Sequence, residues 1–164
     1  MTDKTSPRID PATKKDELLD LPQEVKDELA KHLALYQSDP AAAHMWDPIC
    51  IGVPGGPVKC LMVTFTGRKS GKKIPTVLQY SVLDGKYAVV GTRGGSADHP
   101  NWYLNLVATP ECEIQVGTEH RKAIARTLNA EERAKYWPQI TAEQPEYLIY
   151  EKRTSRVIPV VVFD

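Results

Sequence analysis

The pattern of apolar and polar positions changes once along the chain, from a helical period to a strand period. Between Asp16 and Gln37 the apolar residues recur at three- and four-residue steps, the period of an amphipathic helix: Leu18, Leu21, Val25, Leu29, Leu33 and Tyr36. Pro22 interrupts this run, so the pattern predicts a break there and a firm helix from Gln23 to Gln37. The helix lacks the excess of Lys and Arg and the apolar bulk of a membrane-surface helix, which favours packing on the core or in a dimer.

After an irregular connector, Asp39 to Pro57, the pattern becomes that of β-strands. Apolar and β-branched residues concentrate in six segments: 58–65, 74–83, 86–92, 113–116, 121–128 and 157–163. Asp84-Gly85 is a strong two-residue hairpin signal between the second and third segments, and Gly117 centres the turn between the fourth and fifth.

Three short helices are predicted among the strands. Asp98 is a good N-cap for a helix through Leu106, with Pro100 in its first turn. Asn129 and Glu132 have the spacing of a capping box and predict a helix to about Trp137. Pro138 and Pro145 punctuate a further helical stretch, which holds Tyr147 and Tyr150.

Strands with short helices at their connections, without alternating βα units, predict a mainly β fold with flanking helices, a small antiparallel barrel. The 164 residues suit one compact unit. We expect a flexible leader over 1–14, the N-terminal helix and connector over 15–57, and a barrel that binds a cofactor over 58–164.

Composition narrows the classes of function. Twenty-one Lys and Arg balance 21 Asp and Glu, which disfavours a nucleic-acid binder. The three cysteines form no Cys-x-x-Cys pair and the four histidines have no metal-ligand spacing, so we predict a reducing compartment and no metal site. The N-terminus has no apolar signal region and no apolar run nears the roughly 18 residues of a spanning helix. We therefore expect a cytoplasmic protein without a transmembrane segment, at most peripheral to a membrane.

The turn between the first two strand segments concentrates positive charge. Arg68, Lys69, Lys72 and Lys73 surround Ser70, and Gly67 and Gly71 let the backbone approach a ligand closely. Such a turn can bind a phosphate or a carboxylate; the alternative is a solvated hairpin tip. The Gly-x-Gly-x-x-Gly pattern is absent, and Lys73 stands where a P-loop needs Ser or Thr.

Three motifs follow one another: Gly67-Arg68-Lys69-Ser70-Gly71, Gly91-Thr92-Arg93-Gly94-Gly95, and His99 to Leu106. Their order and spacing resemble the deazaflavin-dependent nitroreductase family, split β-barrel enzymes of the FMN-binding split-barrel type that use coenzyme F420. The resemblance runs from Lys59 to Phe163 and includes Tyr136-Trp137-Pro138 and Ile158-Pro159-Val160.

The resemblance implies a cofactor site in three parts. The basic turn is expected to hold the phosphodiester and oligoglutamate tail, and the later motifs to lie beside the ring. The predicted cofactor-binding residues are Arg68, Lys69, Ser70, Gly71, Lys73, Pro75, Thr76, Val77, Thr92, Arg93, Gly94, Gly95, Trp102, Tyr103 and Asn105. His99 is expected to buttress its helix rather than to act as an acid.

The expected reaction is hydride transfer from the reduced deazaflavin to a quinone, an activated enone or a nitroaromatic compound. The predicted catalytic residues are Thr92, which would stabilise developing negative charge, and Tyr147 and Tyr150, which lie three residues apart on one helix face. The proton would come from either tyrosine or from water. Some nitroimidazole-reducing members carry a further tyrosine where this chain has Gln144, so that activity is not carried over.

The sequence leaves alternatives open for the cofactor, for catalysis and for the role of the two tyrosines. The same barrel could use FMN, or the protein could carry F420 without catalysis. The two tyrosines could form a half-buried amphipathic stripe with no part in the reaction. A small-molecule substrate is expected in either enzymatic case, and the sequence leaves open whether the protein is a monomer or a homodimer.

Overall fold

The computed structural model describes residues 21–164. The predicted leader, 1–14, and the start of the apolar pattern before Leu21 lie outside the described residues. Helix α1 spans Gln23–Ser38 and begins directly after Pro22, as predicted. Proline suits this position because its fixed φ, −51° here, is compatible with a helix start and no hydrogen bond of the helix interior is lost.

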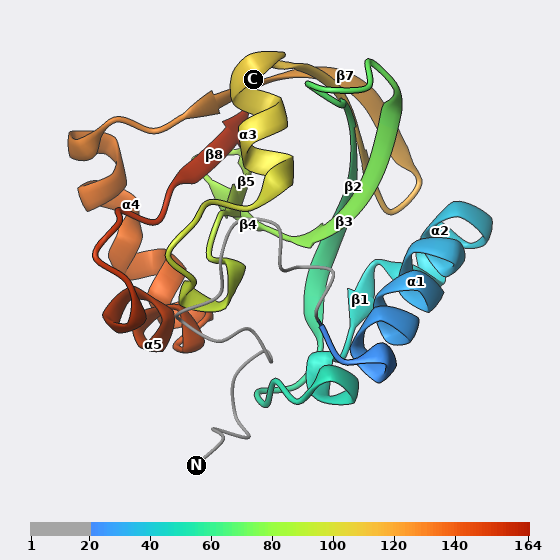
Figure 1. The fold of residues 1–164 in the computed structure, drawn as a ribbon, viewed down its shortest axis with the longest axis horizontal. Coiled ribbons are helices and arrows are strands. Elements are labelled where there is room, and N and C mark those ends of the chain that lie inside the picture. Colours follow the sequence, from blue (N-terminus) through green and yellow to red (C-terminus); the bar gives the residue numbers. More distant parts are fainter. Residues whose placement is uncertain (1–20) are drawn as a thin grey trace.

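An eight-stranded antiparallel sheet forms the body of the molecule and curls into a split barrel (Figure 1). Its order is β1-β2-β6-β7-β8-β5-β4, with β3 paired to β2. The strands are β1 Met45–Trp46, β2 Val58–Thr66, β3 Lys73–Gln79, β4 Ser81–Leu83, β5 Lys86–Val90, β6 Glu111–Val116, β7 Glu119–Thr127 and β8 Val160–Phe163. The mainly β architecture with flanking helices is therefore confirmed.

The predicted strand 74–83 is wrong in one respect, because the structure divides it into β3 and β4. The chain leaves the sheet ladder at Tyr80, whose N–H donates to the carbonyl of Lys59 at 3.0 Å. From there β3 pairs with β2 whereas β4 pairs with β5. Asp84 and Gly85 then turn the chain with φ of 48° and 82°, as their hairpin signal predicts.

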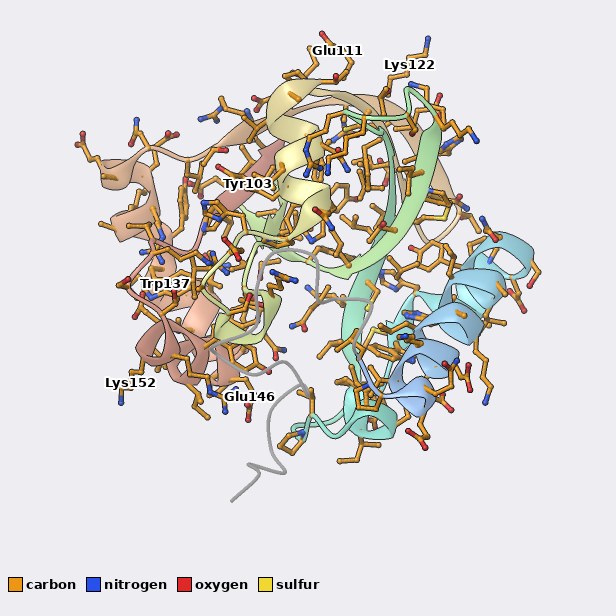
Figure 2. All side chains as sticks on the ribbon, viewed as in Figure 1. Tyr103, Glu111, Lys122, Trp137, Glu146 and Lys152 are labelled. Carbon is orange, nitrogen blue, oxygen red and sulfur yellow. The ribbon has the colours of Figure 1, made fainter. Side chains whose placement is uncertain are left out.

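Two of the predicted helices have different bounds in the structure. Helix α3, Asn101–Ala108, starts after Pro100, so Asp98 is not its N-cap. A proline disfavours helical geometry in the residue before it, which prevents an earlier start. Helix α4, Ala130–Glu143, has the predicted capping box but continues through Pro138 beyond Trp137 (Figure 2). Fully buried Ile140 anchors the continuation to the barrel, so tertiary packing outweighs the cost of the proline.

The remaining short elements complete the connections. Helix α2 covers Pro40–Ala43, and two 3₁₀ turns, η2 and η3, cover Pro48–Ile51 and Arg93–Gly95. Helix α5, Glu146–Arg153, holds the two predicted tyrosines. In Figure 1, α4 and α5 lie on one side of the curled sheet and α1 and α2 on the other.

Helix α1 is fastened to the barrel near its C-terminal end. Tyr36 is fully buried with Ala43, Val58 and Cys60. Its hydroxyl oxygen lies 2.9 Å from the carbonyl oxygen of Cys60 and accepts the Gly117 N–H at 2.8 Å. These bonds join the helix to β2 and to the β6–β7 turn.

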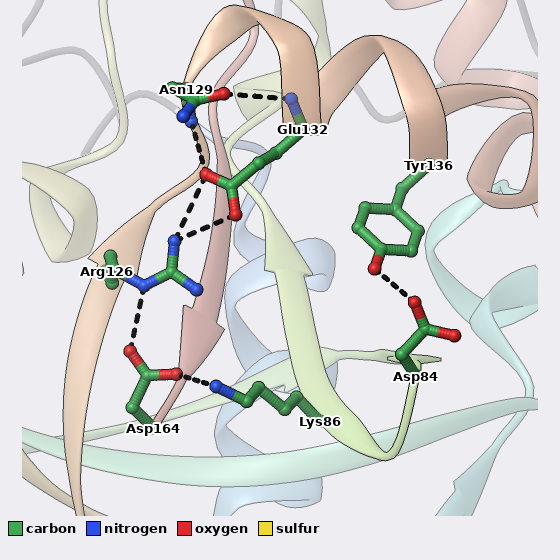
Figure 3. Close-up of polar contacts among 7 residues, drawn as sticks. All are labelled: Asp84, Lys86, Arg126, Asn129, Glu132, Tyr136 and Asp164. Carbon is green, nitrogen blue, oxygen red and sulfur yellow. Dashed lines mark hydrogen bonds and ion pairs between the residues drawn. The ribbon is translucent and has the colours of Figure 1, made fainter.

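A second set of polar contacts joins strand ends to α4 (Figure 3). Asp164 pairs with Lys86 and accepts from Arg126 Nε at 2.9 Å. Arg126 also pairs with Glu132 at 3.1 Å, the residue that closes the Asn129 capping box. Because these charges are largely exposed, they orient the chain ends more than they stabilise the fold.

The described residues contain neither a membrane-spanning helix nor a metal cluster. No helix within residues 21–164 combines the length and apolar character needed to cross a membrane. Over the same residues, no three His, Cys, Asp or Glu side chains converge as a metal site would require.

Candidate functional site

A cavity of about 360 Å³ opens where the sheet is split. β3 and β5 both contribute to its wall, although each pairs with a different neighbour. The other walls come from α1, η2, the loop after β5, the start of α3, and α5 with its approach. Figure 2 shows Glu146 of α5, a lining residue. We call this cavity the pocket.

Several predicted residues meet in the pocket although the sequence separates them widely. These are Thr76, Val77, Thr92, Arg93, Gly94, Trp102, Tyr147 and Tyr150. Gln144 also lines it. Pro75, Gly95, Tyr103, Asn105 and the basic turn are not part of its lining.

The loop after β5 has the most constrained backbone at the site. Arg93, Gly94 and Gly95 all have positive φ, of 43°, 63° and 80°. A left-handed conformation in a non-glycine residue such as Arg93 costs about 1 kcal/mol or more. The surrounding structure therefore holds this loop in a shape that it would not keep alone.

Arg156 supplies much of that support, and the sequence analysis missed it. Its guanidinium donates to the carbonyls of Gly91 at 3.1 Å, Thr92 at 2.8 Å and Ser96 at 2.9 Å. It also donates to Nδ1 of His99 at 3.2 Å. The Arg156 side chain thus forms hydrogen bonds with four residues between positions 91 and 99. No local pattern marks Arg156, since its partners lie some sixty residues earlier in the chain.

The Arg156 contact also defines the state of His99. Arginine has no acceptor, so Nδ1 of His99 must be unprotonated to receive this bond. Burial and the neighbouring Arg156 charge lower the pKa of His99, which favours the same neutral form. The ring packs 4.9 Å from that of Tyr103 and is not part of the pocket lining, which agrees with a buttressing role.

Gly95 allows α5 to lie against this loop. A Cβ there would stand 2.6 Å from the carbonyl oxygen of Tyr150 and 2.9 Å from its Cα. Helix α5 therefore packs directly on backbone, and Tyr147 and Tyr150 reach the pocket with ring centroids 6.2 Å apart.

The hydroxyls in the pocket differ in their surroundings. Tyr150 is almost fully buried, at 3% exposure, whereas Tyr147 is half-buried. No hydrogen bond to a described residue holds the hydroxyl of Tyr147 or of Thr92. Burial raises the pKa of Tyr147, so this hydroxyl keeps its proton and can donate a hydrogen bond.

The basic turn lies beside the pocket and is attached to α3. Arg68 donates to Asn105 Oδ1 through its backbone N–H at 2.9 Å and through Nη1 at 2.8 Å. Its Nη2 reaches Asn101 Oδ1 at 3.3 Å. Lys69, Ser70, Gly71, Lys72 and Lys73 are exposed, although Lys73 also donates to Thr66. Asn105 thus acts by holding Arg68, one turn from Trp102 in the pocket wall.

Tyr103 faces a different place from the one predicted. Its hydroxyl lies 3.1 Å from Oγ1 of Thr127, and its ring lines a separate cavity of about 190 Å³ with residues of β7 and β8 (Figure 2). Its neighbour Trp102 points into the pocket instead. Adjacent residues on a helix diverge by about 100°, which explains why only one of the two can line the pocket.

The wall opposite α5 was not predicted from the sequence either. It is formed by Leu21, Val25, Leu29, Trp46, Pro48, Ile51 and Val53. The helical period predicted the apolar stripe of α1, but only the fold shows that part of this stripe borders the pocket.

Comparison with known proteins agrees with this site. The family model described as F420H(2)-dependent quinone reductase matches residues 47–164. The F420H(2)-dependent quinone reductase Rv1261c of Mycobacterium tuberculosis is 35% identical over 113 residues, which cover 67% of this chain and 75% of the relative.

Two solved structures share the fold. A structure titled F420-H2 dependent reductase (FDR-A) is 38% identical, with a TM-score of 0.59, and covers 64% of this chain and 93% of its own. Another, described as a domain-swapped dimer, is 30% identical with a TM-score of 0.61 and covers 85% of this chain and 99% of its own. The predicted split barrel and F420-dependent class are confirmed: the chain belongs to the F420H(2)-dependent quinone reductase family, whose cofactor is reduced coenzyme F420.

Proposed function

We propose that this protein reduces quinones with reduced F420 bound between the pocket and the basic turn. The observation that carries the proposal is the meeting of Thr92, Trp102 and Tyr147 around one cavity in a chain of this family. Enones and nitroaromatics stay predictions as further acceptors, and a cytoplasmic location stays a prediction too.

The residues present fit the coenzyme. Its ring is planar and its tail is an extended anion. Trp102 and the backbone at Gly94 offer flat surfaces in the pocket, and the exposed lysines of the basic turn offer positive charge. β3 connects the two: Lys73 lies roughly 10 Å along the strand from Thr76, at about 3.3 Å per residue. We propose that Lys69, Ser70, Gly71 and Lys73 hold the tail, with Arg68 positioning the turn.

Bound reduced F420 supplies a hydride, and the quinone needs one proton in addition to become a hydroquinone. Thr92 and Tyr147 line the pocket, and no described residue forms a hydrogen bond with either hydroxyl. We assign them to hydrogen bonds with the quinone oxygen, where negative charge develops. The apolar side chains around them limit water at this point. Tyr150, more deeply buried, packs behind Tyr147 in this assignment.

The first experiment compares F420 with FMN. Reduced F420 should be consumed when 1,4-benzoquinone is added, and FMN should neither bind nor support turnover. Binding of F420 without turnover of any quinone would instead favour the carrier alternative. The relative that forms a domain-swapped dimer makes the homodimer the assembly to test first, by light scattering.

The second experiment tests the pocket hydroxyl. Tyr147→Phe should lower kcat roughly 10- to 100-fold with little change in F420 affinity, because it removes one donor to the developing charge. Tyr136→Phe is the matched control, since Tyr136 lies outside the pocket and bonds Asp84. Equal activity of the two variants would remove Tyr147 from the mechanism.

A further inference from the structure

A second cavity lies beside the pocket, along α1. It has a volume of about 290 Å³ and lies between α1 and β3. Five residues line both cavities: Leu29, Trp46, Thr76, Val77 and Gln79. The shared lining residues place this second space, which we call the α1 groove, directly beside the pocket.

Apolar side chains make up most of the α1 groove on both sides. Helix α1 contributes Leu29, Ala30 and Leu33, and β3 contributes Pro75 and Val77, which lie two residues apart on one strand face. Within residues 21–164, no Asp, Glu, Lys or Arg side chain is part of the lining. An anionic or cationic chain would find no partner here, whereas a hydrocarbon would exchange water for these side chains.

Four polar residues also line the α1 groove: His32, Cys60, Thr76 and Gln79. Thr76 and Gln79 lie where it borders the pocket, and the other two are satisfied or shielded. Nε2 of His32 lies 2.9 Å from the carbonyl oxygen of Ala43, and its ring stacks on Trp46 with centroids 4.6 Å apart. The thiol of Cys60 is buried at 2% exposure. Burial lowers the pKa of His32, so the ring stays neutral and adds no charge to the groove.

The two surfaces of the α1 groove keep a gap because α1 is held elsewhere. Tyr36 fixes the C-terminal half of the helix to the barrel, and Val25 is buried near its start. Between these points Leu29 remains 40% exposed, although it belongs to the apolar stripe. Its uncovered side chain lies where the pocket and the α1 groove join.

We propose that the α1 groove binds the hydrocarbon chain of a lipophilic quinone whose ring occupies the pocket. This inference rests on the proposed function for the ring. It adds that the acceptor carries an uncharged chain of several carbons, and that α1 selects for it. The direction of the chain, away from α5 and beneath α1, follows from the residues that the two cavities share.

The test uses quinones with one ring and different chains. The series is 2,3-dimethoxy-5-methyl-1,4-benzoquinone without a tail and with n-alkyl tails of increasing length. For the unmodified protein we expect kcat/KM to rise about two- to fourfold for each of the first methylene groups buried. A chain-length series without any such rise would overturn the proposal.

Ala30→Trp places a large side chain in the α1 groove at an exposed position, where it does not disturb the core. It should abolish the preference for tailed over tail-less quinone. Ala34→Trp is the matched control, because Ala34 is exposed on the same helix and is not part of the groove. If Ala30→Trp keeps the same chain-length preference as Ala34→Trp, the chain binds elsewhere.

A binding measurement separates this proposal from the proposed function. Calorimetric titration with the n-decyl quinone, in the absence of F420, should show binding that Ala30→Trp weakens at least tenfold and Ala34→Trp retains. Such a result without turnover would contradict quinone reduction while supporting the groove. Turnover of the tail-less quinone, together with equal affinity of both variants for the n-decyl quinone, would support quinone reduction and contradict binding of the chain in the α1 groove.

Discussion

At the scale of single residues, the site depends on a side chain that does not touch the ligand space. Arg156 donates to three carbonyls and one imidazole along residues 91–99. The planar fork of a guanidinium can serve several acceptors at once, which an ammonium cannot do in the same geometry. Arg156 is thus a positioning residue for Thr92 and the loop that follows it.

Arg156→Gln should raise KM for F420 at least tenfold, because carbonyls that lose a charged donor release a loop with positive φ at Arg93. Arg156→Lys should recover only part of this loss. KM and kcat measured separately, together with melting temperature, provide the check. If both variants melt early but bind F420 normally, Arg156 serves the fold and not the site.

At the scale of elements, α5 and the loop after β5 form one unit because Gly95 has no side chain. Gly95→Ala should displace α5, lower the melting temperature and raise KM for the quinone. Gly117→Ala is the matched control: its φ is also positive, at +57°, but a Cβ there meets nothing within 4 Å. In both variants, alanine in a left-handed backbone conformation lowers the free energy of unfolding by about 1–2 kcal/mol. Only Gly95→Ala should also lose quinone affinity, and equal losses would show that α5 is not held this way.

The basic turn is the element that should give F420 binding its salt dependence. Lys69→Ala with Lys72→Ala should weaken F420 about tenfold at low ionic strength and flatten the dependence of Kd on salt, since exposed charges act over about 10 Å at 0.1 M salt. Lys122→Ala with Lys135→Ala removes the same charge from exposed positions on β7 and α4. If the two double variants weaken F420 binding equally, the basic turn is only a solvated hairpin tip.

At the scale of the whole molecule, two histidines link stability to pH. Burial is the main cause that lowers the pKa of both His32 and His99 below the ordinary 6.5. The unfolded chain therefore binds more protons than the folded one just below pH 6.5, and the free energy of unfolding falls as pH decreases through that range.

Urea unfolding between about pH 7.5 and about pH 5.5 should show this loss of stability, and His99→Gln should reduce its slope. His120→Gln, on the exposed β6–β7 hairpin, is the control. A slope that His99→Gln leaves unchanged would mean that the Arg156–His99 contact does not set the protonation of this ring.

The sequence predicted those parts of the fold that depend on near neighbours. The α1 stripe, the Asp84-Gly85 hairpin and the Asn129 capping box are all decided within a few residues, and all three are confirmed. The predicted strand divides at Tyr80 because β3 pairs with β2 and β4 with β5, and Pro138 lies within a helix because Ile140 is anchored beyond it.

The site divides in the same way. The glycine-rich loop, Trp102 and the tyrosines come from motifs and meet as expected in one pocket. Arg156 and the α1 wall could not be found, because each acquires its place only when distant segments come together. The same holds for Tyr103, whose direction depends on where α3 lies over β7.

Helix α1 lies outside residues 47–164, the part of the chain that the family model matches, yet it borders the pocket. The Arg68, Thr92 and Trp102 segments all lie inside that part. One side of the pocket is therefore built from the shared framework and the facing side partly from a separate helix. Exchanging that helix between relatives would alter which acceptors are accommodated while leaving the means of reducing them intact.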